Sequence, residues 1–126
     1  AFPGEISIDP DEPRRGDKVR LRLVRHGQTH QGEECEVGVI AVERYDVTES
    51  DSDGGSSRST RESNEFEQWI SVATTIGEET IEMQIPVEGP FSYEGDAMSF
   101  RWRAEAKIHR KMRADRRAVA PFWVHP

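Results

Sequence analysis

The amino-acid sequence predicts an all-β protein, an antiparallel sandwich of about seven strands. Two observations support this prediction. Apolar and polar residues alternate over several stretches, which is the two-residue period of a strand with one buried face. Turn-forming Gly, Pro and Asp residues separate these stretches. No convincing helical period competes with the pattern.

The stretch from 78 to 109 shows the alternation most clearly. On its first arm, Ile81, Met83 and Ile85 alternate with polar residues and Pro. On its second arm, residues 98–108 alternate between apolar side chains and Ser, Arg, Glu or Lys. Gly and Pro residues between the arms indicate a turn or short loop. We therefore expect a central pair of long antiparallel strands, each with one face on the core.

Five further strands are expected around this pair. The first, residues 5–9, ends at Pro10 and belongs at a sheet edge, because proline cannot donate to a strand ladder. The others are residues 18–24, 35–47, 66–76 and 118–124.

The run from 35 to 47 has an ambiguous phase near Ile40 and Val42. Both a strand buried on its two faces and a bulge that shifts the phase remain open.

Residues 48–64 contain no large apolar side chain. Burial therefore cannot offset the entropy lost when this segment becomes ordered, and we expect a long mobile polar loop that joins neighbouring strands. Its serines lie near acidic residues, which leaves a phosphorylation switch open as a compositional hypothesis.

The chain has 126 residues, which is room for one domain with its own core. Charged residues make up 33% of it and the net charge is −7. This acidity argues against general affinity for nucleic acid or anionic membranes, because both bind basic surfaces. No apolar run approaches the ~20 residues that cross a bilayer.

The sequence begins with Ala-Phe-Pro rather than Met, and we expect it to be a domain of a larger protein. Cys35 is its only cysteine, so no disulfide within the chain is expected. No charged-then-apolar signal segment stands at the front, and we expect a cytoplasmic location. We expect no cofactor, no metal and no catalytic residue.

Several short motifs resemble the pattern of arrestin-like domains. Ile85-Pro86 is followed by Pro-Phe-Ser-Tyr-Glu-Gly at 90–95, and then by an aromatic strand centre at Phe100-Arg101-Trp102. Residues 13–19 resemble the Pro-Gly-Asp step that opens a strand in that clan, and residues 121–124 resemble its last strand in position.

This resemblance covers most of the chain and implies an immunoglobulin-like β-sandwich used for protein binding or scaffolding. Met83 departs from it, because the pattern has Phe there. The clan usually pairs two such domains, of which one fits here. We expect a non-catalytic interaction or scaffold domain that binds a protein partner, not nucleic acid, through an edge strand or the loops at one end. A dimer formed by edge strands is a further option.

A different string, residues 23–29, reads Leu-Val-Arg-His-Gly-Gln-Thr and resembles the signature of histidine phosphatases and phosphoglycerate mutases. That resemblance implies His26 as the phosphoryl-accepting nucleophile and Arg25 as the phosphate ligand. Such enzymes also need a second His followed by Gly and an α/β sheet with helices. No His-Gly follows His26. We interpret the string as coincidental and keep a phosphoryl-transfer enzyme using His26 as the alternative function.

Other candidate groups are interpreted as structural. His26 and His30 with Glu33-Glu34 could place metal ligands on a loop, but they do not form a closed ligand set. The three tryptophans are expected in the core: Trp69, Trp102 and Trp123. The basic run 109–117 is expected to be a solvated face, with docking of an acidic partner as the alternative.

Overall fold

The computed structural model describes residues 2–27, 33–50, 52–73 and 76–126, which form strands and connecting turns without a helix. The strands are β1 (Gly4–Asp9), β2 (Lys18–Arg25), β3 (Glu34–Ser50), β4 (Ser56–Val72), β5 (Gly77–Gln84), β6 (Tyr93–Glu94), β7 (Met98–His109) and β8 (Arg116–Phe122). The predicted all-β class is confirmed.

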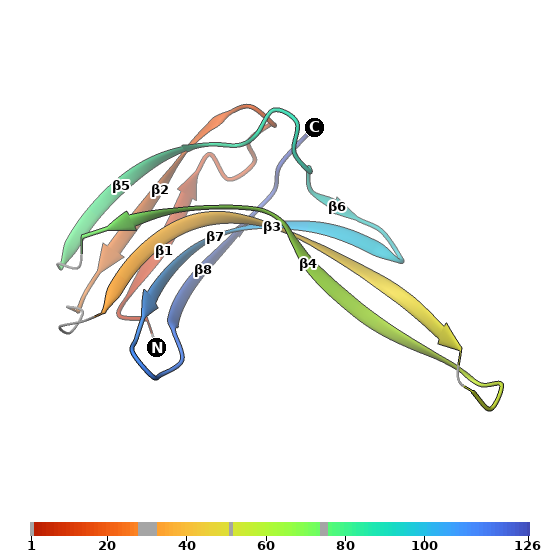
Figure 1. The fold of residues 1–126 in the computed structure, drawn as a ribbon. Coiled ribbons are helices and arrows are strands. Elements are labelled where there is room, and N and C mark those ends of the chain that lie inside the picture. The colour runs from red at the N-terminus through yellow and green to blue at the C-terminus, as the bar shows by residue number, and fades with distance from the viewer. Residues whose placement is uncertain (1, 28–32, 51, 74–75) are drawn as a thin grey trace.

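Two antiparallel sheets face each other (Figure 1). The small sheet has the strand order β1-β2-β5, and the large sheet has the order β4-β3-β7-β6 with β8 also paired to β7. All seven expected strands are present, and β1 lies at a sheet edge as predicted. The additional strand, β6, has two residues and is too short to show a period in the sequence.

The core lies between the two sheets. The small sheet contributes residues such as Leu21 and Leu23, and the large sheet contributes Val37 and Val39, all fully buried. Trp102 fills the space near one end of this core. Its ring centroid lies 5.5 Å from that of Phe66 and 5.8 Å from that of Phe122. Its Nε1–H donates to the carbonyl of Pro90 at 3.2 Å.

The expected central pair is wrong, because β5 and β7 belong to different sheets. β5 pairs with β2, while β7 pairs with β3, β6 and β8. The chain between them crosses from one sheet to the other. Ile85 donates its N–H to Asp17, and Ser92 donates its N–H to Val124. A two-residue period identifies the buried face of a strand but not its neighbours.

Of the two interpretations left open for residues 35–47, the strand buried on both faces is confirmed, whereas the bulge lies in the neighbouring strand β4 and β3 keeps its phase. Ile40 and Val42 are buried on the face opposite the core, so β3 is covered on both faces. The register of β3 against β4 also shifts between Ala41 and Val42, which places Glu65 of β4 in a bulge. A bulge turns the strand locally and increases its twist.

The expected mobile loop at 48–64 is wrong. β3 runs through Ser50, β4 starts at Ser56, and the two pair without interruption from Val42↔Asn64 to Ser50↔Ser56. Backbone pairing and polar cross-strand contacts order this segment without apolar burial. Arg61 pairs with Glu49 at 2.6 Å, and the Thr60 hydroxyl donates to Asp46 at 3.2 Å. Each such exposed pair contributes roughly 0.2–1 kcal/mol. The single-domain organisation and the larger parent protein stay predictions.

Candidate interaction surface

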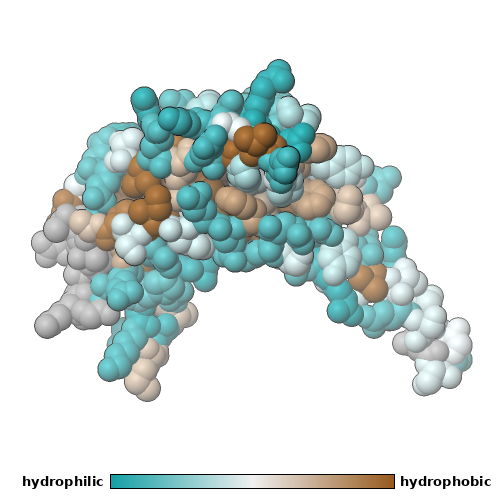
Figure 2. All heavy atoms as spheres, turned by 45° about the horizontal axis from the view of Figure 1, so that its top comes forward, coloured by the Kyte–Doolittle hydropathy of each residue, from teal (hydrophilic) through white to brown (hydrophobic). Residues whose placement is uncertain are grey.

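The long hairpin of β3 and β4 extends past the small sheet (Figure 1). We call its paired residues 42–50 and 56–64 the arm. The last residue of β3 that pairs with β7 is Tyr45, opposite Met98, and the rest of the arm is a two-stranded ribbon. Figure 2 shows its far end as a projection from the body. A projection of this kind offers backbone and side chains to a partner from several sides.

The outer edge of β4 is unpaired along the described strand, because β4 bonds only to β3. The Asp46 N–H donates to Ala97 beside β7, so the backbone groups of Asp46 point away from β4. Residue pairs along an antiparallel ladder alternate between pairs that exchange backbone hydrogen bonds and pairs that do not. Asp46 lies opposite Thr60, so this pair is of the second kind. The N–H and C=O of Thr60 therefore point outward, and those of Arg58 and Glu62 do the same.

The arm and its tip are acidic. Residues 42–65 carry seven Asp or Glu and three Arg, a net charge of −4. Charged side chains along an edge strand oppose indiscriminate pairing with other sheets. A partner for this edge therefore has to match the charge of the arm as well as supply strand geometry.

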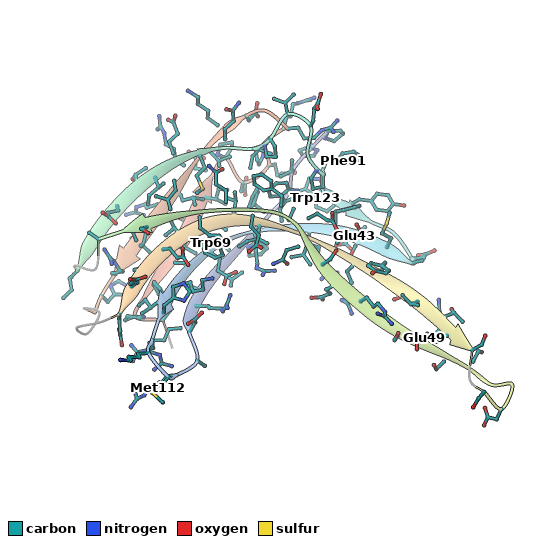
Figure 3. All side chains as sticks on the ribbon, viewed as in Figure 1. Glu43, Glu49, Trp69, Phe91, Met112 and Trp123 are labelled. Carbon is teal, nitrogen blue, oxygen red and sulfur yellow. The ribbon has the colours of Figure 1, made fainter. Side chains whose placement is uncertain are left out.

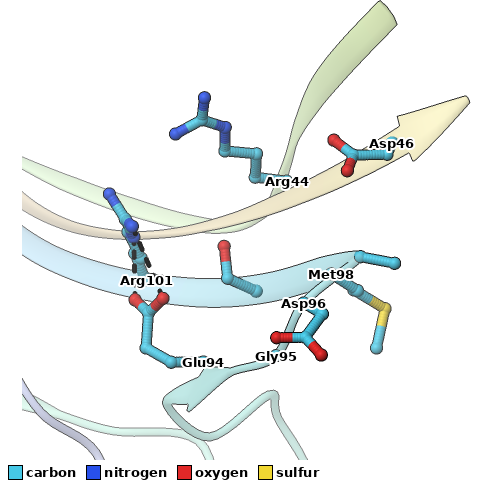
Figure 4. A pocket seen from close by; sticks show the side chains of 9 residues that line it. Arg44, Asp46, Glu94, Gly95, Asp96, Met98 and Arg101 are labelled. Carbon is cyan, nitrogen blue, oxygen red and sulfur yellow. Dashed lines mark hydrogen bonds and ion pairs between the residues drawn. The ribbon is translucent and has the colours of Figure 1, made fainter. Parts of the chain in front are cut away.

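A polar hollow of about 210 Å³ lies where the arm leaves the body, between the part of β3 around Arg44 and Asp46, the strand β6 and the start of β7 (Figure 4). Within it, the Arg101 guanidinium donates two hydrogen bonds to the Glu94 carboxylate, from Nε to Oε1 at 2.9 Å and from Nη2 to Oε2 at 3.4 Å. Hydrogen bonding to Glu94 is the larger cause that raises the pKa of Arg101, and the negative charge of Glu94 is the second cause. Arg44 also lines the hollow and is exposed. The hollow can hold a charged group by ion pairing.

The phosphatase-like string does not form a site among the residues described. Arg25 is buried and pairs with Glu79 at 3.6 Å, whereas His26 is exposed just after the strand. A nucleophile and its phosphate ligand must converge, and these two side chains differ in burial and environment. Gln28 and Thr29 of the string lie outside the described residues.

Arg25 instead closes one end of the core beside Cys35. Its Nε and Nη1 are buried without a hydrogen bond to the described chain. Cys35 is a free, buried thiol. Burial raises the pKa of this thiol above its ordinary value, and the nearby Arg25 offsets only part of the rise. This places Arg25 and Cys35 in the packing of the sandwich rather than at its surface.

The other sequence candidates have mixed outcomes. Within the described ranges, no group of three or more His, Cys, Asp or Glu side chains could hold a metal ion, and no helix is long and apolar enough to cross a membrane. His30 lies outside those ranges. The basic run is partly structural, because Arg117 pairs with Glu105 and Arg110 donates to the carbonyl of Ala114. Met112 stands exposed at the tip of this turn (Figure 3).

Only one of the three tryptophans is a core residue as expected. Trp102 is buried, but Trp69 lies on the outer face of the large sheet and Trp123 is 38% exposed. The ring of Trp69 packs over Gly38, and the Lys107 ammonium sits 4.1 Å from its centroid. Phe66, Ile70 and Val72 share the core-facing phase of β4, and Trp69 lies on the opposite phase, so its nearness to apolar residues in the sequence did not indicate its face.

The outer face also contains a buried carboxylate that sequence reasoning missed. Glu105 is 1% exposed and pairs with Arg103 at 2.9 Å and with Arg117. The alternation of apolar and polar residues in β7 indicates that Glu105 is a surface residue. It is buried because the aliphatic parts of Arg103 on β7 and Arg117 on β8 cover it. The pairing of β7 with β8, which sequence does not show, brings Arg117 to this position.

No protein-family model matches the chain, and no curated protein matches it. Among solved structures, the crystal structure of Spo0M, a sporulation control protein from Bacillus subtilis, resembles it with a TM-score of 0.50 and 10% sequence identity. The match covers 100% of this chain and 51% of that one, so the chain spans about half the length of Spo0M. Together with the two facing antiparallel sheets, this likeness shows that the chain has an arrestin-like fold, an immunoglobulin-like β-sandwich.

Proposed function

We propose that this chain is a non-catalytic protein-interaction domain whose partner adds a strand to the free edge of β4. The observation that supports this most directly is the unpaired outer edge of a 17-residue strand. Main-chain hydrogen bonds from an added strand supply affinity, and side chains beside the edge supply selectivity. The partner is a protein segment in extended conformation.

Two further observations favour binding over catalysis. The phosphoryl-transfer alternative needs Arg25 at an open site, and Arg25 is buried against Glu79. The fold is also that of a sporulation control protein, which is compatible with a regulatory, non-enzymatic role. A second copy of the chain is one partner that could supply the added strand.

The substitution Thr60→Pro tests strand addition. Proline removes the outward N–H at Thr60 and leaves the ladder to β3 intact, because the Thr60 N–H does not point toward β3. We expect the variant to bind the proteins that co-purify with the wild type, or to bind itself, with an affinity lowered by about tenfold or more. A tenfold change in affinity corresponds to about 1.4 kcal/mol of binding free energy. Quantitative affinity purification and light scattering measure the two effects.

Thr60→Ala is the matched control, because it removes the same hydroxyl and keeps the N–H. It should retain the partners. Circular dichroism of both variants checks that the sheet persists. Equal recovery of the same partners by Thr60→Pro and by the wild type would show that the β4 edge is not the binding element.

A further inference from the structure

The core-side face of the large sheet continues past the end of the small sheet. Its last covered row holds the buried Trp102 of β7, with Phe66 on β4 and Phe122 on β8. The next two rows on this face have no second layer above them among the described strands, and their apolar members lie outside the core cluster. In register, these rows are Ser63–Glu43–Phe100–Tyr93 and Arg61–Tyr45–Met98.

The members of these rows that belong to β6 and β7 form one wall of an apolar hollow of about 310 Å³. Tyr93, Met98 and Phe100 line it from β6 and β7, and Pro90 and Phe91 line it from the preceding loop. Tyr93 is 46% exposed and Met98 is 41% exposed, although both are large apolar side chains. Large side chains gathered around a concavity are the usual lining of a binding pocket.

The loop wall of the hollow is held in place by contacts from three directions. Arg15 donates to the carbonyl of Gly89 at 3.2 Å and stands 5.1 Å from the centroid of Phe91. Trp102 donates to the carbonyl of Pro90, and the Ser92 hydroxyl accepts the N–H of Val124 at 2.7 Å. The hollow therefore exists before a ligand arrives, which lowers the entropic cost of binding.

An unpaired carboxylate lies beside the hollow. Glu43 is half-buried and lies directly opposite Phe100 on the same face of the sheet. Arg61, in the adjacent row, pairs with Glu49 instead. No described residue makes an ion pair or hydrogen bond with the Glu43 side chain, and the same holds for Glu88 in the loop. In Figure 3, Glu43 and Phe91 both lie at the end of the body from which the arm extends.

We propose that this hollow binds a segment of a protein partner that presents one large apolar side chain next to a Lys or Arg. The apolar side chain fills the space between Phe91, Tyr93, Met98 and Phe100, and the cation meets Glu43. The surrounding net charge of −4 on residues 42–65 selects against acidic segments. The inference rests on the chain being an interaction domain, but it does not need strand addition to β4.

Three fluorescein-labelled synthetic peptides of equal length test the proposal by fluorescence anisotropy. One carries a central Phe flanked by Lys, the second carries the same Phe flanked by Glu, and the third carries Ser flanked by Lys. We expect the Lys–Phe peptide to bind the wild type at least about tenfold more tightly than either of the others, because both the apolar anchor and the charge contribute.

Four variants locate the binding. Tyr93→Ser should weaken the Lys–Phe peptide by about tenfold, since it removes one side of the hollow. Glu43→Gln should reduce the preference for Lys over Glu flanks. Val119→Ser, an exposed apolar position on the outer face of the same sheet, should change nothing. Thr60→Pro should also leave peptide binding unchanged, whatever it does to edge pairing.

Several results would overturn the proposal. These are equal affinity for all three peptides, no measurable binding of the Lys–Phe peptide, and binding that Tyr93→Ser leaves intact while circular dichroism shows a folded variant. If Thr60→Pro abolishes partner recovery while Tyr93→Ser changes neither peptide nor partner binding, the edge alone is the interaction site and the hollow is not.

Discussion

Replacement of Trp102 by alanine is expected to lower the free energy of unfolding by about 3–5 kcal/mol, the usual cost of deleting a buried Trp side chain. Trp102 is 1% exposed and joins the core to the loop before β6. The substitution removes its contacts with Phe66 and Phe122, opens a cavity between the sheets, and frees the carbonyl of Pro90. Urea unfolding followed by circular dichroism measures the change.

Trp123→Ala is the matched control, because it deletes the same side chain at a position that is 38% exposed. Trp123 follows β8, and its ring lies 6.5 Å from that of His125. We expect a loss of about 1 kcal/mol, as is typical of substitutions away from the core. Equal losses for the two variants would contradict the assignment of Trp102 alone to the core.

Gly38→Ala is expected to destabilise the sheet by about 1–3 kcal/mol, the range for overpacking a tight site. A Cβ at Gly38 would stand 2.4 Å from the carbonyl oxygen of Gln68 and 2.7 Å from the ring of Trp69. The oxygen belongs to the β3–β4 ladder and cannot move without loss of pairing. Without these contacts, alanine would stabilise a strand relative to glycine, so the sign of the effect tests the geometry.

The double variant Gly38→Ala with Trp69→Ala separates the two contacts. Removing the ring relieves one clash and leaves the other, so Gly38→Ala should cost less in the Trp69→Ala background. Thermal unfolding of the four proteins of this cycle gives the coupling. An unchanged cost in the two backgrounds would show that Trp69 does not pack over Gly38.

Strands with an apolar face could be predicted from the sequence. In β7, the positions of Trp102, Ala104 and Ala106 alternate with polar residues and face the core, as the period indicates. The neighbours of each strand could not be predicted. β5 and β7 are separated in the sequence only by a loop and the two-residue β6, yet they lie in different sheets, because the connecting segment crosses over the end of the core.

The outer part of the arm, residues 48–50 and 56–64, could not be predicted because it lacks the signal on which strand prediction depends. Both faces of residues 56–64 are exposed, so no apolar residue marks a period. The order of this segment comes from pairing with β3, and an extended polar run does not show its partner. The candidate surfaces share this limitation: Glu43 and Phe100 are adjacent only through the register of β3 on β7.

Hydrogen exchange of the β4 amides, measured by NMR, tests most directly whether the arm is an ordered hairpin with a free outer edge. We expect alternation, with inward amides protected by about tenfold or more over outward ones. The inward amides are those of Ser59, Arg61 and Ser63, and the outward amides are those of Arg58, Thr60 and Glu62. Uniformly fast exchange over 56–64 would show a mobile loop without an edge for a partner, and the paired arm would be wrong.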